Sequence, residues 1–176
     1  MRLSIPVTAL LLALASCVAP SRQAPPPPPQ QAPSVPATPA PQPNANWRDR
    51  PVSPGEWSYQ QDGSGSAAQY VNMSRTTDLF IRCDKSLRRI QIARAGSVSA
   101  NGAQMIVRTS FGDALWPARN VTGSPSYVAA DVDPRDPWLD KIAFSRGRIA
   151  VEVTGLPPLT TPVWPEIVRV IEDCRA

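Results

Sequence analysis

The sequence contains no histidine. This absence excludes Ser-His-Asp and Cys-His catalytic arrangements, the His-Glu-x-x-His zinc motif and every histidine general base. Lysine is almost absent too, because only Lys85 and Lys141 occur. Lys85 lies beside Ser86 in a predicted tight turn, where adjacent side chains do not point at each other, which disfavours a Ser-Lys dyad. We predict a non-enzyme that binds no cofactor or metal, although a glycosidase carboxylate pair is recognised only in space.

Long apolar runs are also missing, since no stretch approaches the length of about 20 residues that a membrane-spanning helix needs. The main apolar run extends from Leu3 to Ala15 and follows a basic residue, which predicts a secretory targeting segment. It ends in Leu14-Ala15-Ser16-Cys17, which resembles the lipobox of bacterial lipoproteins. The resemblance implies that residues 1–16 are a signal peptide and that Cys17 is lipidated.

Lipid on Cys17 would anchor the protein permanently, because each buried methylene contributes about 0.8 kcal/mol and two or three acyl chains add up. Val18, rather than Asp, follows the cysteine, which in lipoproteins implies sorting to the outer membrane. We therefore expect a bilayer-anchored protein of the cell envelope that faces the periplasm. The alternative is an ordinary secretory signal that is cut after Ala19, which Pro20 disfavours.

Proline is concentrated in one segment, because 11 of the 22 prolines lie between Pro20 and Pro43. Residues 17–46 hold few apolar residues and a single charge, Arg22, which predicts a disordered, extended linker. At about 3.1 Å per residue, the linker would span up to roughly 80 Å. Such a segment can also be a ligand for an aromatic-lined groove, but we favour a spacer.

The remaining residues, 47–176, are enough for a single domain with a core of its own, which we expect to be monomeric. They hold 16 basic and 14 acidic residues, a net charge of +2, and 14 of the basic residues are arginine. This charge is too weak for a nucleic-acid-binding domain, and an extracytoplasmic location argues against that partner as well. It is compatible with the anionic polymers of an envelope.

Two cysteines remain, Cys83 and Cys174, in a compartment where disulfides persist. Cys83 shares a period-2 face with Leu79 and Ile81, and Cys174 follows Ile171 on the apolar stripe of a terminal helix. Because both thiols point inward, we predict a disulfide, which contributes about 4 to 5 kcal/mol by closing a long loop. A metal or redox pair is the alternative, but no histidine or close cysteine supports it.

Short alternating stretches separated by turn residues predict a mainly β fold, an antiparallel β-sandwich or open barrel. Asp136-Pro137 indicates the start of a short internal helix, and Pro165-Glu166 the start of a C-terminal helix. Small and polar residues in the second strand are typical of a sheet edge. The expected strands span residues 55–59, 67–73, 78–84, 88–95, 104–110, 113–117, 126–132 and 147–154, and the internal helix spans 136–144.

A second resemblance is carried by the strand at residues 80–84, the segment at 153–157 and a final helix that ends near Cys174. Together they resemble small two-Cys periplasmic domains of envelope lipoproteins. They are also loosely similar to accessory lipoproteins of type VI secretion and to invasion-associated locus B proteins. The resemblance implies a two-Cys sandwich and an extracytoplasmic setting, and it brings no catalytic residues.

Four aspartates, at positions 131, 133, 136 and 140, suggest a calcium site, because Ca²⁺ takes several oxygens from one loop. In an EF-hand register that begins at Asp131, Asp136 occupies the position of the glycine and Ile142 that of the final glutamate. Helix capping explains the same aspartates, and we favour it.

Arginine is the remaining candidate for binding, because a guanidinium can hold carboxylate or phosphate bidentately. Five arginines fall on neighbouring predicted strands, where some would share an outward face. Glycan carboxylates, lipid A phosphates or an acidic protein would be their ligands. The alternative is that arginine merely replaces lysine as a solubilising residue, and we expect Trp116 and Trp164 to be packing residues. The five are Arg82, Arg88, Arg89, Arg94 and Arg108.

These features predict a lipid-anchored envelope lipoprotein that is a non-catalytic binding or scaffolding module for an envelope protein or an anionic polymer. Two alternatives stay open. An accessory component of a secretion or envelope assembly would need a large protein interface. An inhibitor of a cell-wall lytic enzyme would need a protruding loop.

Overall fold

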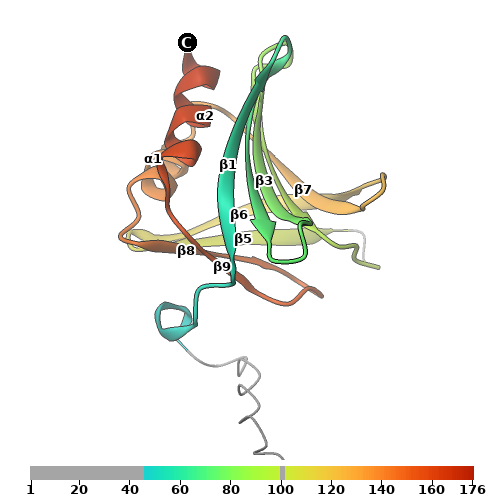
Figure 1. The fold of residues 1–176 in the computed structure, drawn as a ribbon, viewed down its shortest axis with the longest axis vertical. Coiled ribbons are helices and arrows are strands. Elements are labelled where there is room, and N and C mark those ends of the chain that lie inside the picture. The colour runs from blue at the N-terminus through green and yellow to red at the C-terminus, as the bar shows by residue number, and fades with distance from the viewer. Residues whose placement is uncertain (1–45, 100–101) are drawn as a thin grey trace, which may run out of the picture. The chain divides into compact units, whose positions relative to one another are not determined.

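The structure is a computed structural model that describes residues 46–99 and 102–176. The predicted signal peptide, Cys17 and, apart from Asn46, the predicted linker lie outside the described residues. The described part is mainly antiparallel β-structure with a short internal and a C-terminal helix, which confirms the predicted fold class (Figure 1). Its elements are η1 (Trp47–Asp49), β1 (Gly55–Asp62), β2 (Gly65–Asn72), β3 (Thr77–Asp84), β4 (Arg89–Ala95), β5 (Ala103–Thr109), β6 (Gly112–Val121), β7 (Tyr127–Val132), α1 (Pro137–Ala143), β8 (Arg148–Val153), β9 (Leu159–Pro162) and α2 (Pro165–Arg175).

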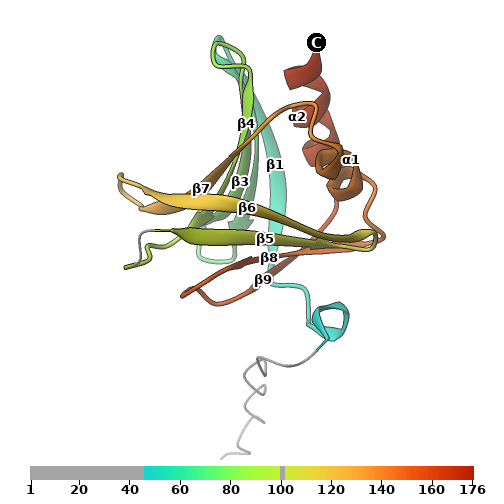
Figure 2. The same cartoon turned by 180° about the vertical axis from the view of Figure 1, so that it is seen from behind.

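The strands form two groups that share β6 and cross each other in space (Figure 2). One group contains β1–β4 and β7, and the other contains β5, β8 and β9. Residues 112–118 of β6 pair with β5, and residues 119–121 pair with β7. The strand order is β1-β2-β3-β4-β7-β6-β5-β8-β9, so β1 and β9 are the two ends of a nearly closed barrel. Trp57 Nε1 donates a hydrogen bond to Pro162 O (2.9 Å) across the seam between β1 and β9.

The core follows the alternation that the sequence predicts for a half-buried strand. Leu79, Ile81 and Cys83 of β3 are buried. In β8 the buried residues include Ile149, Val151 and Val153, which share one face of the strand. Their side chains pack into one apolar cluster between the two groups of strands and the helices.

Both predicted helices are present, and each begins where its proline indicates. The Asp136 carboxylate caps α1 by accepting a hydrogen bond from Trp138 N–H (2.8 Å). α2 begins at Pro165 and buries Ile167, Val170 and Ile171 against the inner face of the strands β1–β4. The apolar stripe therefore orients α2 so that its opposite face meets solvent.

The Cys83–Cys174 disulfide is present and confirms the predicted pairing. The two Cα atoms lie 5.3 Å apart, within the usual range for a bridge, and the cysteines are 91 residues apart in the chain. Because Cys174 lies in the last turn of α2, the bridge fixes the end of this helix to the end of β3.

The prediction that the second strand is an edge strand is wrong, because β2 lies between β1 and β3 and the edge is β1. The small residues that suggested an edge, including Ala67 and Ala68, are buried. Ala68 belongs to the apolar core, and α2 packs on the same part of the sheet.

β1 and β6 extend beyond their predicted bounds, and one further strand was not predicted. β6 is predicted to end at Pro117 but continues to Val121. Proline has no N–H to donate, and it is tolerated here because one edge of β6 is unpaired at Pro117. That edge faces away from β5, and its pairing with β7 begins only at Arg119. β9 was not predicted at all. Its four residues follow Pro157-Pro158 and end at Pro162, and such a short segment forms a strand only because β8 is beside it.

Candidate functional site

Two of the five predicted binding arginines share the outward face of neighbouring strands, as expected. Arg82 of β3 and Arg89 of β4 each face an aspartate: Arg82 Nη2 lies 3.1 Å from Asp62 Oδ2, and Arg89 Nη1 lies 3.4 Å from Asp131 Oδ2. A hydrogen bond from the Ser64 hydroxyl, with further help from Arg82, lowers the pKa of Asp62 to about 2. These two arginines are therefore already paired within the fold.

Arg94 and Arg108 lie elsewhere and are also engaged. Arg94 is on the inner face of β4 and donates hydrogen bonds to the backbone oxygens of Asp78 (3.0 Å) and Ala95 (3.1 Å). Arg108 is on β5, in the other group of strands, where Nη2 lies 2.9 Å from Glu152 Oε2. The structure therefore does not gather the five arginines into one patch.

Arg88 is the exception. It was expected to begin the fourth strand but lies in the turn before β4, with φ of 48° and an exposed side chain. Within the part of the chain that the structure describes, Arg88 makes no ion pair. It lines a pocket of about 300 Å³ together with two arginines that the sequence analysis did not select, Arg135 and Arg175.

We call this hollow the arginine pocket. Arg175 is held in place, because its Nε donates to Pro134 O (2.7 Å) and its Nη1 donates to Asp140 Oδ1 (2.6 Å). Arg135 is exposed and, like Arg88, has no ion-pair partner among the described residues. The pocket is lined by Arg88, Asp133, Pro134, Arg135, Cys174 and Arg175.

Three separate segments bring these side chains together. The turn before β4 is fixed by Asp84, whose Oδ1 accepts a hydrogen bond from Leu87 N–H (3.0 Å). The loop before α1 is fixed by Asp133, whose Oδ1 accepts one from Arg135 N–H (2.8 Å). The disulfide attaches the end of α2 to β3. Three guanidinium groups with one carboxylate lining the pocket can hold a phosphate or carboxylate group.

Arg135 and Arg175 were not predicted, because the arginine pattern of neighbouring strands does not include them: Arg135 lies in a loop and Arg175 in the last turn of a helix. One signal was available. The predicted Cys83–Cys174 pairing places Arg175 near the end of the third strand, a few residues from Arg88. Nothing in the sequence indicates that Arg135 joins them.

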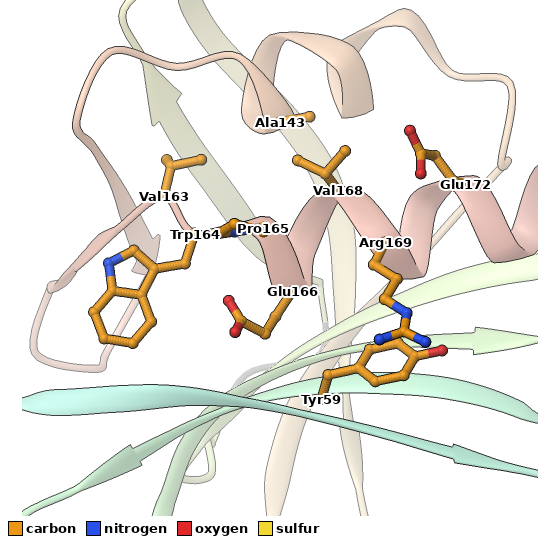
Figure 3. A pocket seen from close by; sticks show the side chains of 9 residues that line it. All are labelled: Tyr59, Ala143, Val163, Trp164, Pro165, Glu166, Val168, Arg169 and Glu172. Carbon is orange, nitrogen blue, oxygen red and sulfur yellow. The ribbon is translucent and has the colours of Figure 1, made fainter.

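A second hollow, the α2–β1 groove, is lined mainly by the first turns of α2 and has a volume of about 690 Å³. Figure 3 shows the side chains that line it. Arg169 of α2 lies 4.0 Å over the ring of Tyr59 on β1, and Tyr59 Oη donates a hydrogen bond to Asp173 Oδ2 (2.6 Å). This hydrogen bond raises the pKa of Tyr59. The groove is lined by Tyr59, Ala143, Val163, Trp164, Pro165, Glu166, Val168, Arg169 and Glu172.

The two tryptophans that we predict to be packing residues differ in their burial. Trp116 is buried and donates from Nε1 to Asp136 Oδ2 (3.1 Å), as the packing interpretation requires. Trp164 exposes 38% of its surface and lies at the wall of the α2–β1 groove. Beside it, Glu166 Oε2 is buried and has no hydrogen-bond partner among the described residues.

The four clustered aspartates serve as caps and ion-pair partners. Asp133 and Asp136 cap the loop and the helix that follow them, Asp131 lies 2.7 Å from Arg119 Nη2, and Asp140 pairs with Arg175. Across residues 46–99 and 102–176, no group of three or more His, Cys, Asp or Glu residues is placed to hold a metal ion. Helix capping therefore explains Asp136, whereas Asp133 fixes the turn before the helix.

Among the described helices, none is both long and apolar enough to cross a bilayer. No protein-family model matches this sequence, and no curated protein or solved structure gives a significant match either.

Proposed function

We propose that this chain is a lipid-anchored lipoprotein of the bacterial envelope whose folded domain is a non-catalytic binding module for an anionic envelope polymer. The arginine pocket is the observation that carries the proposal. It offers two guanidinium groups without ion-pair partners in the described residues, those of Arg88 and Arg135, and a third, Arg175, that is held in place by hydrogen bonds.

The shared chemistry of the ligand is an oxyanion with at least two oxygens, a phosphate or a carboxylate. Guanidinium groups bind such groups bidentately, and three of them around one hollow favour a group that can meet more than one arginine at once. Repeated anionic groups along a polymer would raise the avidity of a membrane-bound protein, because its neighbours on the same surface can bind the same chain.

The anchor is proposed from the lipobox-like residues that end in Cys17. Cys17→Ser removes the thiol that would carry the lipid, so we expect the protein to move from the membrane fraction to the soluble fraction. Retention in the membrane at the wild-type level would contradict the anchor and leave the pocket to be judged separately.

Binding is tested with two defined probes, vesicles that contain lipid A for phosphate and soluble polygalacturonate for carboxylate. The full chain carries Cys17→Ser so that acyl chains do not bind the vesicles. We expect Arg88→Glu with Arg135→Glu to abolish binding to the preferred probe, and binding to weaken at high salt. The matched control reverses two exposed arginines outside the pocket, Arg75→Glu with Arg146→Glu. Equal losses in both double variants, or binding to neither probe, would overturn the proposal.

A further inference from the structure

The end strand β1 leaves part of its backbone unpaired. β1 pairs with β2 on one side, and on its other side the described part of the chain bridges the seam only near the start of the strand. There Ser53 N–H donates to Thr160 O (2.8 Å) and Trp57 Nε1 donates to Pro162 O. Among the described residues, no backbone hydrogen bond joins residues 58–62 to β9. Such an edge is a template for an added strand.

The α2–β1 groove lies next to this edge. Tyr59 projects from β1 toward α2, and Trp164 and Glu166 lie on the same side of the helix (Figure 3). Because successive residues of a strand point to opposite faces, a strand added to β1 would direct every second side chain into the groove. Trp164 provides an exposed apolar wall for one of them.

The charges of the groove select a positively charged side chain. Glu166 and Glu172 line it, and Arg169, the single cation among the described residues that line it, already lies over the ring of Tyr59. Glu166 Oε2 is buried and accepts no hydrogen bond from any residue that the structure describes, and leaving such an acceptor unsatisfied costs free energy. A lysine or arginine side chain that enters beside Trp164 would supply the missing donor.

We propose that the α2–β1 groove binds an extended peptide segment of a partner protein. The segment adds a strand to residues 58–62 of β1 and places a basic side chain against Glu166. Main-chain hydrogen bonds supply affinity in this mode, and the side-chain contacts to Trp164 and Glu166 supply specificity. This surface is separate from the arginine pocket, so either can fail without the other.

The test uses the full chain and three matched synthetic peptides, read by fluorescence anisotropy. The first alternates valine and threonine around one central lysine, the second has glutamate in place of the lysine, and the third is the lysine peptide with N-methyl groups on the edge that would pair. We expect binding of the lysine peptide alone. Equal binding of the N-methylated peptide would exclude strand addition, and equal binding of the glutamate peptide would exclude the role of Glu166.

Two variants locate the site. Glu166→Gln should weaken the lysine peptide by about tenfold, the usual effect of losing a hydrogen bond to a charged group. Its matched control is Glu56→Gln, which removes an equal charge from the exposed opposite face of β1 and should change nothing. Peptide binding that survives Glu166→Gln unchanged would overturn the proposal. So would self-association of the chain without peptide binding, which would assign the edge to a second copy.

Discussion

Two groups of arginines in this domain differ in what surrounds them. Arg50 and Arg108 both reach Glu152, a carboxylate whose side chain is only 20% exposed, and Arg50 itself is 9% exposed. The arginines of the arginine pocket face mainly solvent and outnumber the one carboxylate that lines it. The number of arginines in a region therefore does not identify a binding site. The supply of nearby carboxylates does, because it decides which guanidinium groups remain available for a ligand.

The electrostatic surroundings of the two groups of arginines also differ. Burial alone would raise the pKa of Glu152, but hydrogen bonds from Arg108 and Arg50 outweigh it and hold the pKa below its ordinary value. The hydrogen bond to Glu152 also raises the pKa of Arg108. At the arginine pocket, Asp133 uses one oxygen to accept a hydrogen bond from Arg135 N–H, and Asp140 pairs with Arg175. Arginine thus stabilises the fold in one region, whereas in the other Arg88 and Arg135 form no ion pair with any described residue.

The largest expected effect comes from removing the disulfide that frames the arginine pocket. Cys83→Ser with Cys174→Ser should lower the free energy of unfolding by about 4 kcal/mol, because the bridge closes a loop across 91 residues. Because Cys174 lines the pocket, affinity for inorganic phosphate should fall as well. Urea denaturation and phosphate titration of the same protein check both. An unchanged unfolding midpoint would show that the bridge does not support this end of α2.

The second-largest effect is expected when the carboxylate that pairs with Arg50 and Arg108 loses its charge. Glu152→Gln should lower the free energy of unfolding by about 2 kcal/mol at neutral pH, because a charge-assisted contact to the buried Arg50 is lost. The lowered pKa of Glu152 sets the sign of the pH dependence. Its contribution is present above the unfolded-state pKa and is lost as the pH falls through the folded-state pKa, so wild type and variant should converge in acid.

Denaturation curves of the two proteins from neutral to acidic pH measure this convergence. Phosphate affinity should not change in the Glu152→Gln variant, because Glu152 lies outside the arginine pocket. A constant difference in stability at every pH would show that the carboxylate charge plays no part.

Some of this arrangement follows from the sequence and some does not. The alternation around Cys83 predicts an inward thiol, and Asp136-Pro137 predicts a capped helix, because both signals depend on neighbouring residues alone. The position of β9 and the meeting of Arg88 with Arg135 depend on contacts between segments far apart in the chain. Local patterns carry no information on those contacts. The partnering of Arg82, Arg89 and Arg108 with carboxylates escaped prediction for the same reason.

A smaller effect on stability is expected from the pocket arginines themselves. Arg88→Ala and Arg135→Ala should each change the free energy of unfolding by no more than about 0.5 kcal/mol, since both side chains are exposed. Phosphate affinity should nevertheless fall by about tenfold in each. Thermal melts and isothermal titration separate the two properties. A loss of stability comparable to that of Glu152→Gln would place these arginines in the structural group.

The smallest effect tests the one carboxylate of the pocket. Asp133→Asn removes a negative charge but keeps an oxygen that can accept the hydrogen bond from Arg135 N–H. Phosphate should therefore bind about threefold more tightly, a gain typical of one exposed charge pair. Isothermal titration with inorganic phosphate at low salt measures it. Weaker binding would mean that Asp133 organises the loop through its charge.

The most direct test of the central claim is nuclear magnetic resonance of the arginine Nε–Hε groups of the full chain during titration with inorganic phosphate. We expect the signals of Arg88 and Arg135 to shift together in a saturable manner, while those of Arg50 and Arg108 stay in place. Shifts that never saturate, or that are equal in both groups of arginines, would contradict an anion site at the arginine pocket.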